Sequence, residues 1–124
     1  MSRYDVIIIG AGPGGIFAAY ELAKKAPELK VAVFEAGNSL EKRKCPIDGK
    51  KIKSCINCKT CAIMSGFGGA GAFSDGKYNI TNDFGGTLYE YIGKDTAIDL
   101  MKYVDEINLA YGGEGTKMYS NAGT

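Results

Sequence analysis

The sequence predicts the α/β class, with a partial parallel sheet, helices and one long cysteine-containing excursion. Three observations predict this class. An apolar run at 5–9 enters the glycine-rich turn 10–15, a helical pattern follows, and a second run at 30–34 ends at Glu35. This order of strand, glycine turn, helix, strand and acid is typical of the βαβ unit that opens a Rossmann-like dinucleotide-binding fold.

The first run and the turn predict a phosphate site. The run 5–9 has no polar alternation, which is typical of a strand buried on both faces of a parallel sheet. Gly10 permits a tight turn out of the strand, Gly12 lets a pyrophosphate approach the backbone, and Gly15 lets the helix pack closely on the strand.

The predicted helix begins at Pro13, whose missing N–H is not needed at the first helical position. Pro13 and Gly14 open a first turn whose free N–H groups and positive dipole end favour an anion. Lys24 and Lys25 suit the C-terminal end of this helix, and Pro27 is compatible with its stop.

Glu35 lies 20 residues after Gly15, with Ala36 beside it. This is the spacing of a carboxylate that accepts hydrogen bonds from the adenosine ribose hydroxyls. An acid at this position disfavours a 2′-phosphate, so we do not expect NADP at this site. The alternative is an α/β turn that binds no ligand.

Composition narrows the class of protein. The 124 residues carry a net charge of +1 and 23% charged residues, which argues against a nucleic-acid or membrane-surface partner. No apolar run is long enough for a bilayer and no signal leader is visible, so we expect a cytoplasmic protein. The chain has no histidine, the usual general base. Two strong strands are too few for a complete doubly wound sheet, and a companion chain is one candidate for completing the domain.

Residues 37–65 form a polar, basic excursion that holds all four cysteines. Cys55, Cys58 and Cys61 form a CxxCxxC run, and Cys45 could supply a fourth ligand. This arrangement suits an iron–sulfur cluster, whereas structural zinc usually takes two separated CxxC pairs. A redox-active dithiol and a set of reduced, unligated thiols are the alternatives.

A second glycine-rich segment, GFGGAGAFSDGK at 66–77, is expected to return toward the sheet. Its candidate ligand contacts are Gly68, Gly69, Ala70, Ser74 and Asp75. The glycines expose backbone N–H groups and the last two residues add polar side chains. The segment is therefore either a second phosphate or flavin-ring contact, or a series of tight turns.

The last third carries helical patterns at 87–92 and 95–111, with Asp95 or Thr96 as the N-cap and Gly112-Gly113 as the stop. We interpret the apolar face of the longer helix as a packing surface.

The fingerprint, Cys45-Pro46-Ile47, the CxxCxxC run and GFGGAGAFSDGK in this order resemble the uncharacterised bacterial FAD-dependent dehydrogenases, also described as NAD(FAD)-utilising dehydrogenases. The resemblance spans roughly residues 4–93. It implies an FAD/NAD(P)-binding fold in which the fingerprint glycines and Glu35 hold the ADP half of FAD, and in which 66–77 lie near the flavin or its pyrophosphate.

The chain would then be the N-terminal part of an FAD-binding domain, 1–124. Its expected parts are a βαβ fingerprint at 1–36, a cysteine-rich excursion at 37–65, a glycine-rich flavin loop at 66–86 and a helical segment at 87–124.

The functional expectation is an FAD-dependent oxidoreductase, of the dehydrogenase type, or an N-terminal fragment of one. It would exchange electrons with a small-molecule redox substrate or an electron carrier, and NAD(P)H is a candidate donor. No side chain is assigned as catalytic. The alternative is a non-catalytic or truncated dinucleotide-binding module.

Overall fold

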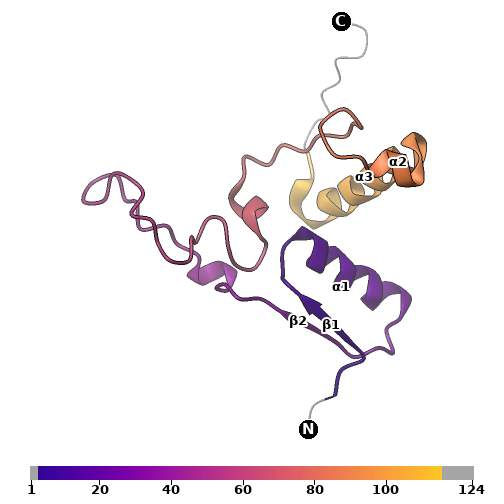
Figure 1. Ribbon diagram of the computed structural model, residues 1–124, viewed down its shortest axis with the longest axis horizontal. Coiled ribbons are helices and arrows are strands. Elements are labelled where there is room, and N and C mark those ends of the chain that lie inside the picture. Colours follow the sequence, from indigo (N-terminus) through magenta and orange to yellow (C-terminus); the bar gives the residue numbers. More distant parts are fainter. Residues whose placement is uncertain (1–2, 116–124) are drawn as a thin grey trace, which may run out of the picture. The chain divides into compact units, whose positions relative to one another are not determined.

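The structure is a computed structural model, and it describes residues 3–115. The chain divides into two compact units, 1–75 and 76–124, each of which is built on its own set of elements (Figure 1).

The first unit begins with the predicted βαβ arrangement. Strand β1 spans Val6–Ile9, helix α1 spans Pro13–Lys25, and strand β2 spans Val31–Phe34. The strands pair in parallel, with Val6 opposite Val31 and Ile9 opposite Phe34. Helix α1 runs alongside this two-stranded sheet (Figure 1). The prediction of an α/β piece that begins with a parallel βαβ unit is therefore confirmed.

The burial of β1 differs from the prediction. The alternate residues Val6 and Ile8 are half-buried, whereas Ile7 and Ile9 are 57% and 81% exposed. Phe34 on β2, the partner of Ile9, is 54% exposed. Helix α1 packs against both strands, and among the described elements it is the only one that does so. The expectation that β1 is buried on both faces is wrong for this chain, since no described element covers the second face.

Residues 35–75 are mostly irregular, as the glycine and polar content predicted. Two short 3₁₀ helices interrupt them, Leu40–Lys42 and Ala70–Phe73. This region departs from the end of β2 and returns near the start of α1 (Figure 1). Its backbone is therefore positioned by hydrogen bonds and by close glycine contacts more than by a hydrophobic core.

The second unit is helical. Helix α2 spans Leu88–Ile92 and helix α3 spans Lys94–Asn108, and the two pack together with Ala97 fully buried. The final turn, Leu109–Gly113, departs from helical geometry at Gly112, which has a φ of 130°. Both predicted helices and the glycine stop are confirmed.

The predicted cap of the longer helix is wrong. The N-cap residue is Gly93, whose φ of 83° lets the chain turn directly from α2 into α3. Asp95 and Thr96 therefore lie within the first turn instead of capping it. None of the helices in the described part of the chain is long and apolar enough to cross a membrane.

Candidate nucleotide-binding site

The glycine turn after β1 has the geometry that the fingerprint predicted. Gly10 has a φ of 97°, a conformation that favours glycine, and its N–H donates to the carbonyl of Phe34 at 2.7 Å. A Cβ atom on Gly15 would overlap the carbonyl oxygen of Gly10 and would lie 3.2 Å from a methyl group of Ile8. The absence of a side chain at Gly15 is therefore what allows α1 to lie directly on β1.

Helix α1 begins at Pro13, as predicted. The first helical hydrogen bond runs from the N–H of Ile16 to the carbonyl of Gly12 at 2.9 Å. The N–H groups of Gly14 and Gly15 precede this bond and lie at the positive end of the helix dipole. This end of α1 therefore offers N–H donors that suit a phosphate group.

Glu35 follows β2 directly and joins two turns. One carboxylate oxygen accepts a hydrogen bond from the N–H of Ala11, and the other accepts one from the N–H of Gly37, each at 2.8 Å. These two donors hold the pKa of Glu35 below its ordinary value, and the positive charge of Arg43 adds to the effect. The carboxylate is therefore ionised at neutral pH and fixed in position.

The predicted contact of Glu35 with ribose hydroxyls remains a prediction. Each carboxylate oxygen can accept more than one hydrogen bond, so the two backbone donors leave capacity for a ligand. What the sequence did not indicate is that the same carboxylate ties the glycine turn to the turn after β2.

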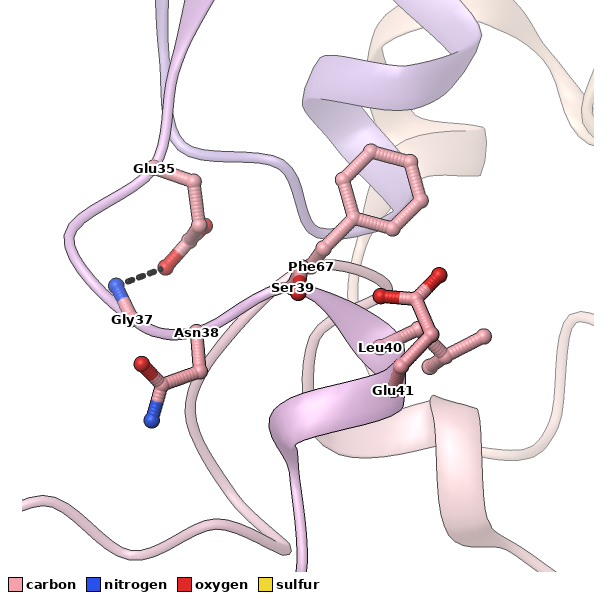
Figure 2. A pocket seen from close by; sticks show the side chains of 7 residues that line it. All are labelled: Glu35, Gly37, Asn38, Ser39, Leu40, Glu41 and Phe67. Atoms are coloured by element: carbon pink, nitrogen blue, oxygen red, sulfur yellow. Dashed lines mark hydrogen bonds between the residues drawn. The ribbon is translucent and has the colours of Figure 1, made fainter.

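A pocket of about 480 Å³ lies beside Glu35 (Figure 2). Most of its lining follows β2 in sequence, from Gly37 through Asn38 and Ser39 to the 3₁₀ turn. Phe67 is the one lining residue from a distant segment. The pocket lies at the carboxyl end of β2, the edge of a parallel sheet where ligands bind in α/β folds. Sequence reasoning missed Phe67, because an isolated aromatic residue in a glycine-rich segment carries no positional signal.

We call Gly66–Gly69 the glycine loop. It packs against the turn after β1, since the N–H of Gly68 donates to the carbonyl of Ala11 at 2.7 Å. A Cβ atom on Gly69 would lie 3.0 Å from the Cα atom of Gly12 and 3.1 Å from Pro13. The prediction that this segment returns toward the sheet is confirmed, and the structure adds that it meets the glycine turn after β1.

The neighbouring predicted ligand contacts lie further along the same unit. Ala70 opens the 3₁₀ helix Ala70–Phe73, the N–H of Ser74 donates to the carbonyl of Gly71, and Asp75 ends the first unit. Ala36 lies between Glu35 and Gly37. Contacts of these residues with a cofactor stay predictions.

The four cysteines are exposed and line one pocket of about 220 Å³, together with Pro46 and Ile47. Asn57 has a φ of 53°, and its N–H donates to the sulfur of Cys55 at 3.4 Å. Within residues 3–115, no three ligand-type side chains are placed so that they could hold a metal ion. The structure therefore gives the predicted iron–sulfur cluster no support: the spacing brings the thiols to one pocket but not to one centre.

Comparison with known proteins gives partial matches. Residues 1–41 match the Thi4 family. A thiamine thiazole synthase of Yarrowia lipolytica is 64% identical over 33 residues, which is 27% of this chain and 10% of that protein. A thiamine thiazole synthase of Candida albicans is 54% identical over 35 residues, 28% of this chain and 10% of that protein.

A longer match involves a bacterial protein. An uncharacterized protein of Clostridium beijerinckii is 39% identical over 71 residues, which is 57% of this chain and 13% of that protein. The chain thus spans about a tenth of the length of the curated relatives it matches. No solved structure matches the chain.

The lengths of these matches distinguish similarity over the βαβ unit alone from similarity that extends beyond it. A match of 33 residues is about the length of the βαβ unit from β1 to Glu35. A match of 71 residues exceeds the 41 residues of the family match and therefore extends beyond the βαβ unit. The start of the chain is thus similar to the N-terminal region of the Thi4 family, while the similarity to the bacterial protein extends over a longer part of the chain.

Proposed function

We propose that the first unit binds the ADP half of FAD, and that the chain is the N-terminal part of an FAD-dependent oxidoreductase of the dehydrogenase type. One observation carries the proposal. The ionised Glu35 lines an open pocket of about 480 Å³ at the carboxyl end of a parallel βαβ unit, and its carboxylate accepts a hydrogen bond from Ala11, two residues before α1 begins.

The residues present suit the ADP group. Gly12 has no side chain, and a Cβ atom there would meet one described atom within 4 Å, the Cα atom of Gly69. That distance, 3.9 Å, is ordinary van der Waals contact, so a methyl group would fit in the nucleotide-free chain but would occupy space that a pyrophosphate needs. We assign the pyrophosphate to Gly12 and the N–H groups of Gly14 and Gly15, and the ribose to Glu35.

The oxidoreductase part of the proposal rests on the order of three motifs along the chain: the βαβ fingerprint, the CxxCxxC run and the glycine-rich segment 66–77. FAD, when bound, supplies the hydride or electron chemistry, and the protein supplies position and electrostatics. The glycine loop and the segment through Ser74 and Asp75 would face the flavin side. NAD(P)H is the proposed electron donor, and a small-molecule redox substrate or an electron carrier the acceptor. The matches to the thiazole synthases have about the length of the βαβ unit, so they support the nucleotide site and not a role in thiazole synthesis.

A non-catalytic dinucleotide-binding module is the second candidate, and the bare face of the sheet favours it. Ile7, Ile9 and Phe34 leave an apolar strand face in water, as in a domain that lacks one of its layers. On this view a companion chain covers the exposed face of the sheet, and the present chain contributes only the nucleotide-binding site.

The test compares Gly12→Ala with Gly14→Ala. Gly12 has a φ of −80°, which alanine adopts without strain, and a Cβ atom on Gly14 meets no atom within 4 Å. Both variants should therefore fold. Isothermal titration with ADP and with FAD should show at least about tenfold weaker binding for Gly12→Ala, since the methyl group blocks the approach to the backbone. An affinity of Gly12→Ala for ADP equal to that of the native chain would refute the site assignment.

The visible spectrum after reconstitution with FAD separates the two functional candidates. Tight binding of FAD with a flavin band that bleaches on addition of NADH supports the oxidoreductase. Binding of ADP with no retained FAD supports the module.

A further inference from the structure

Arg43 is the buried charged residue of the described chain, with 4% of its surface exposed. It follows the 3₁₀ turn Leu40–Lys42 in a segment whose neighbouring side chains, Lys42 and Lys44, are exposed. Among residues 3–115, no carboxylate lies within ion-pair distance of its guanidinium. A buried cation of this kind needs another source of stabilisation.

That stabilisation comes from four backbone carbonyls. The Nε atom donates to Ala62 at 2.8 Å and Nη2 donates to Ile63 at 2.6 Å. The Nη1 atom donates to Phe67 at 2.7 Å and to Gly69 at 2.9 Å. The guanidinium also lies over the Phe73 ring, 4.9 Å from its centroid. Four of the five N–H donors of Arg43 thus form hydrogen bonds with two segments of irregular backbone.

The two segments have different positions in the site. Ala62 and Ile63 directly follow Cys61, at the end of the cysteine run. Phe67 and Gly69 belong to the glycine loop, which packs on the first glycine turn and supplies Phe67 to the pocket beside Glu35. Arg43 therefore joins the cysteine run to the loop that borders the nucleotide pocket.

The local packing is built around this side chain. A Cβ atom on Gly66 would lie 2.6 Å from Cδ and 2.9 Å from Nε of Arg43. The N–H of Phe67 then donates to the carbonyl of Asn38 at 3.0 Å. Lysine could not replace the arginine, because a single ammonium group cannot reach carbonyls in a planar fork.

We propose that Arg43 is a positioning residue that holds the glycine loop against the first glycine turn and thereby shapes the nucleotide pocket. The proposal rests on the proposed nucleotide site, but its structural half does not require a ligand. It gives a role to a basic residue that belongs to none of the motifs in the sequence.

The test uses the 124-residue chain with Arg43→Lys and Arg43→Gln, and Lys44→Gln as the control that removes one exposed positive charge. The first readout is amide hydrogen exchange in the nucleotide-free protein. Exchange at Phe67, Gly68 and Gly69 should rise at least about tenfold in both Arg43 variants and stay unchanged in Lys44→Gln. Protection of the β1 and β2 amides reports whether the βαβ unit remains folded.

The second readout is the affinity for ADP, which should fall at least about tenfold in both Arg43 variants. Loop protection and ADP affinity that both survive in Arg43→Lys would overturn the proposal, since charge alone would then suffice. Unchanged loop exchange in Arg43→Gln would also overturn it. If Arg43→Gln loses the βαβ unit as well, Arg43→Lys decides by the same two readouts. Failure of the native chain to bind ADP would sink the proposed nucleotide site, while the exchange experiment would still test the hold of Arg43 on the loop.

Discussion

The contact between α1 and β1 at Gly15 allows a quantitative test, Gly15→Ala against Gly14→Ala. The added methyl group on Gly15 would overlap the carbonyl oxygen of Gly10 and would lie 3.1 Å from its carbonyl carbon and 3.2 Å from an Ile8 methyl. Carbon atoms normally pack about 3.5–4.0 Å apart, so α1 would have to move away from the strand. On Gly14 the same methyl group meets no atom within 4 Å.

The matched pair isolates this overlap from helix propensity. Both glycines lie in the first turn of α1, and replacing either by alanine brings a similar gain of up to about 1 kcal/mol. The gain cancels in the comparison. What remains is the cost of overpacking, about 1–3 kcal/mol. In a domain of this size that corresponds to a melting temperature lower by about 4–8 °C for each kcal/mol.

Urea and thermal unfolding followed by circular dichroism measure the difference. We expect Gly14→Ala to match or exceed the native chain and Gly15→Ala to unfold at lower urea. Should the two variants unfold at the same urea concentration, α1 does not lie on β1 as described and the reasoning fails. If unfolding is not cooperative, hydrogen exchange at the β1 amides gives the same ranking.

Three further predictions concern the site. The pKa of Glu35 lies below its ordinary 4.5 in the folded chain, so its contribution to stability is present above the ordinary pKa and is lost as pH falls through the folded value. Amide protection at Ala11 and Gly37 should therefore decrease when the pH is lowered below about 4.5. A Glu35→Gln variant that showed the same decrease over the same pH range would contradict this assignment. Gly12→Val should abolish FAD binding, because its branched side chain would occupy the space in which the pyrophosphate approaches the backbone, and an unchanged titration would place the pyrophosphate elsewhere. Iron and sulfide analysis of anaerobically purified protein tests the cysteines: a cluster requires both elements in stoichiometric amounts, whereas a metal-free, sulfide-free protein with full flavin activity rules it out.

The predictable part of the fold was the part governed by chain-local rules. Apolar runs of strand length, a proline at the first helical position and glycines at fixed offsets defined the βαβ unit, and Gly10 and Gly15 have the conformational and packing roles that their residue type predicted. The burial of β1 could not be predicted in the same way. It depends on a covering layer, and the described residues contain none on that face.

The unpredicted part of the site depends on contacts between segments far apart in sequence. Arg43 and Phe67 are 24 residues apart and meet because the chain folds back on itself at the cysteine run. Neither has a periodic or motif context that would distinguish it from other basic or aromatic residues. The cysteines show the converse case, in which a strong spacing pattern brought four thiols to one pocket without assembling a metal centre.

Glu35 and Arg43 hold the irregular half of the first unit by complementary means. The carboxylate collects N–H groups from two turns, and the guanidinium collects carbonyls from two segments. Within the described chain, Glu35 and Arg43 do not form an ion pair with each other. The hydrogen bond that the N–H of Gly68 donates to the carbonyl of Ala11 then connects the turns held by Glu35 with the segments held by Arg43.

This arrangement predicts which substitutions lower both stability and nucleotide affinity and which lower affinity alone. The βαβ unit depends on Gly15 and on the sheet, so loss of that packing should lower stability and nucleotide affinity together. The pocket depends on hydrogen bonds from two charged side chains to loop backbone, so replacing Glu35 or Arg43 should lower affinity while β1, α1 and β2 keep their amide protection. A variant at Glu35 or Arg43 whose βαβ amides lose protection as fast as its loop amides would show that the loops and the sheet form one cooperative unit, and the separation would not hold.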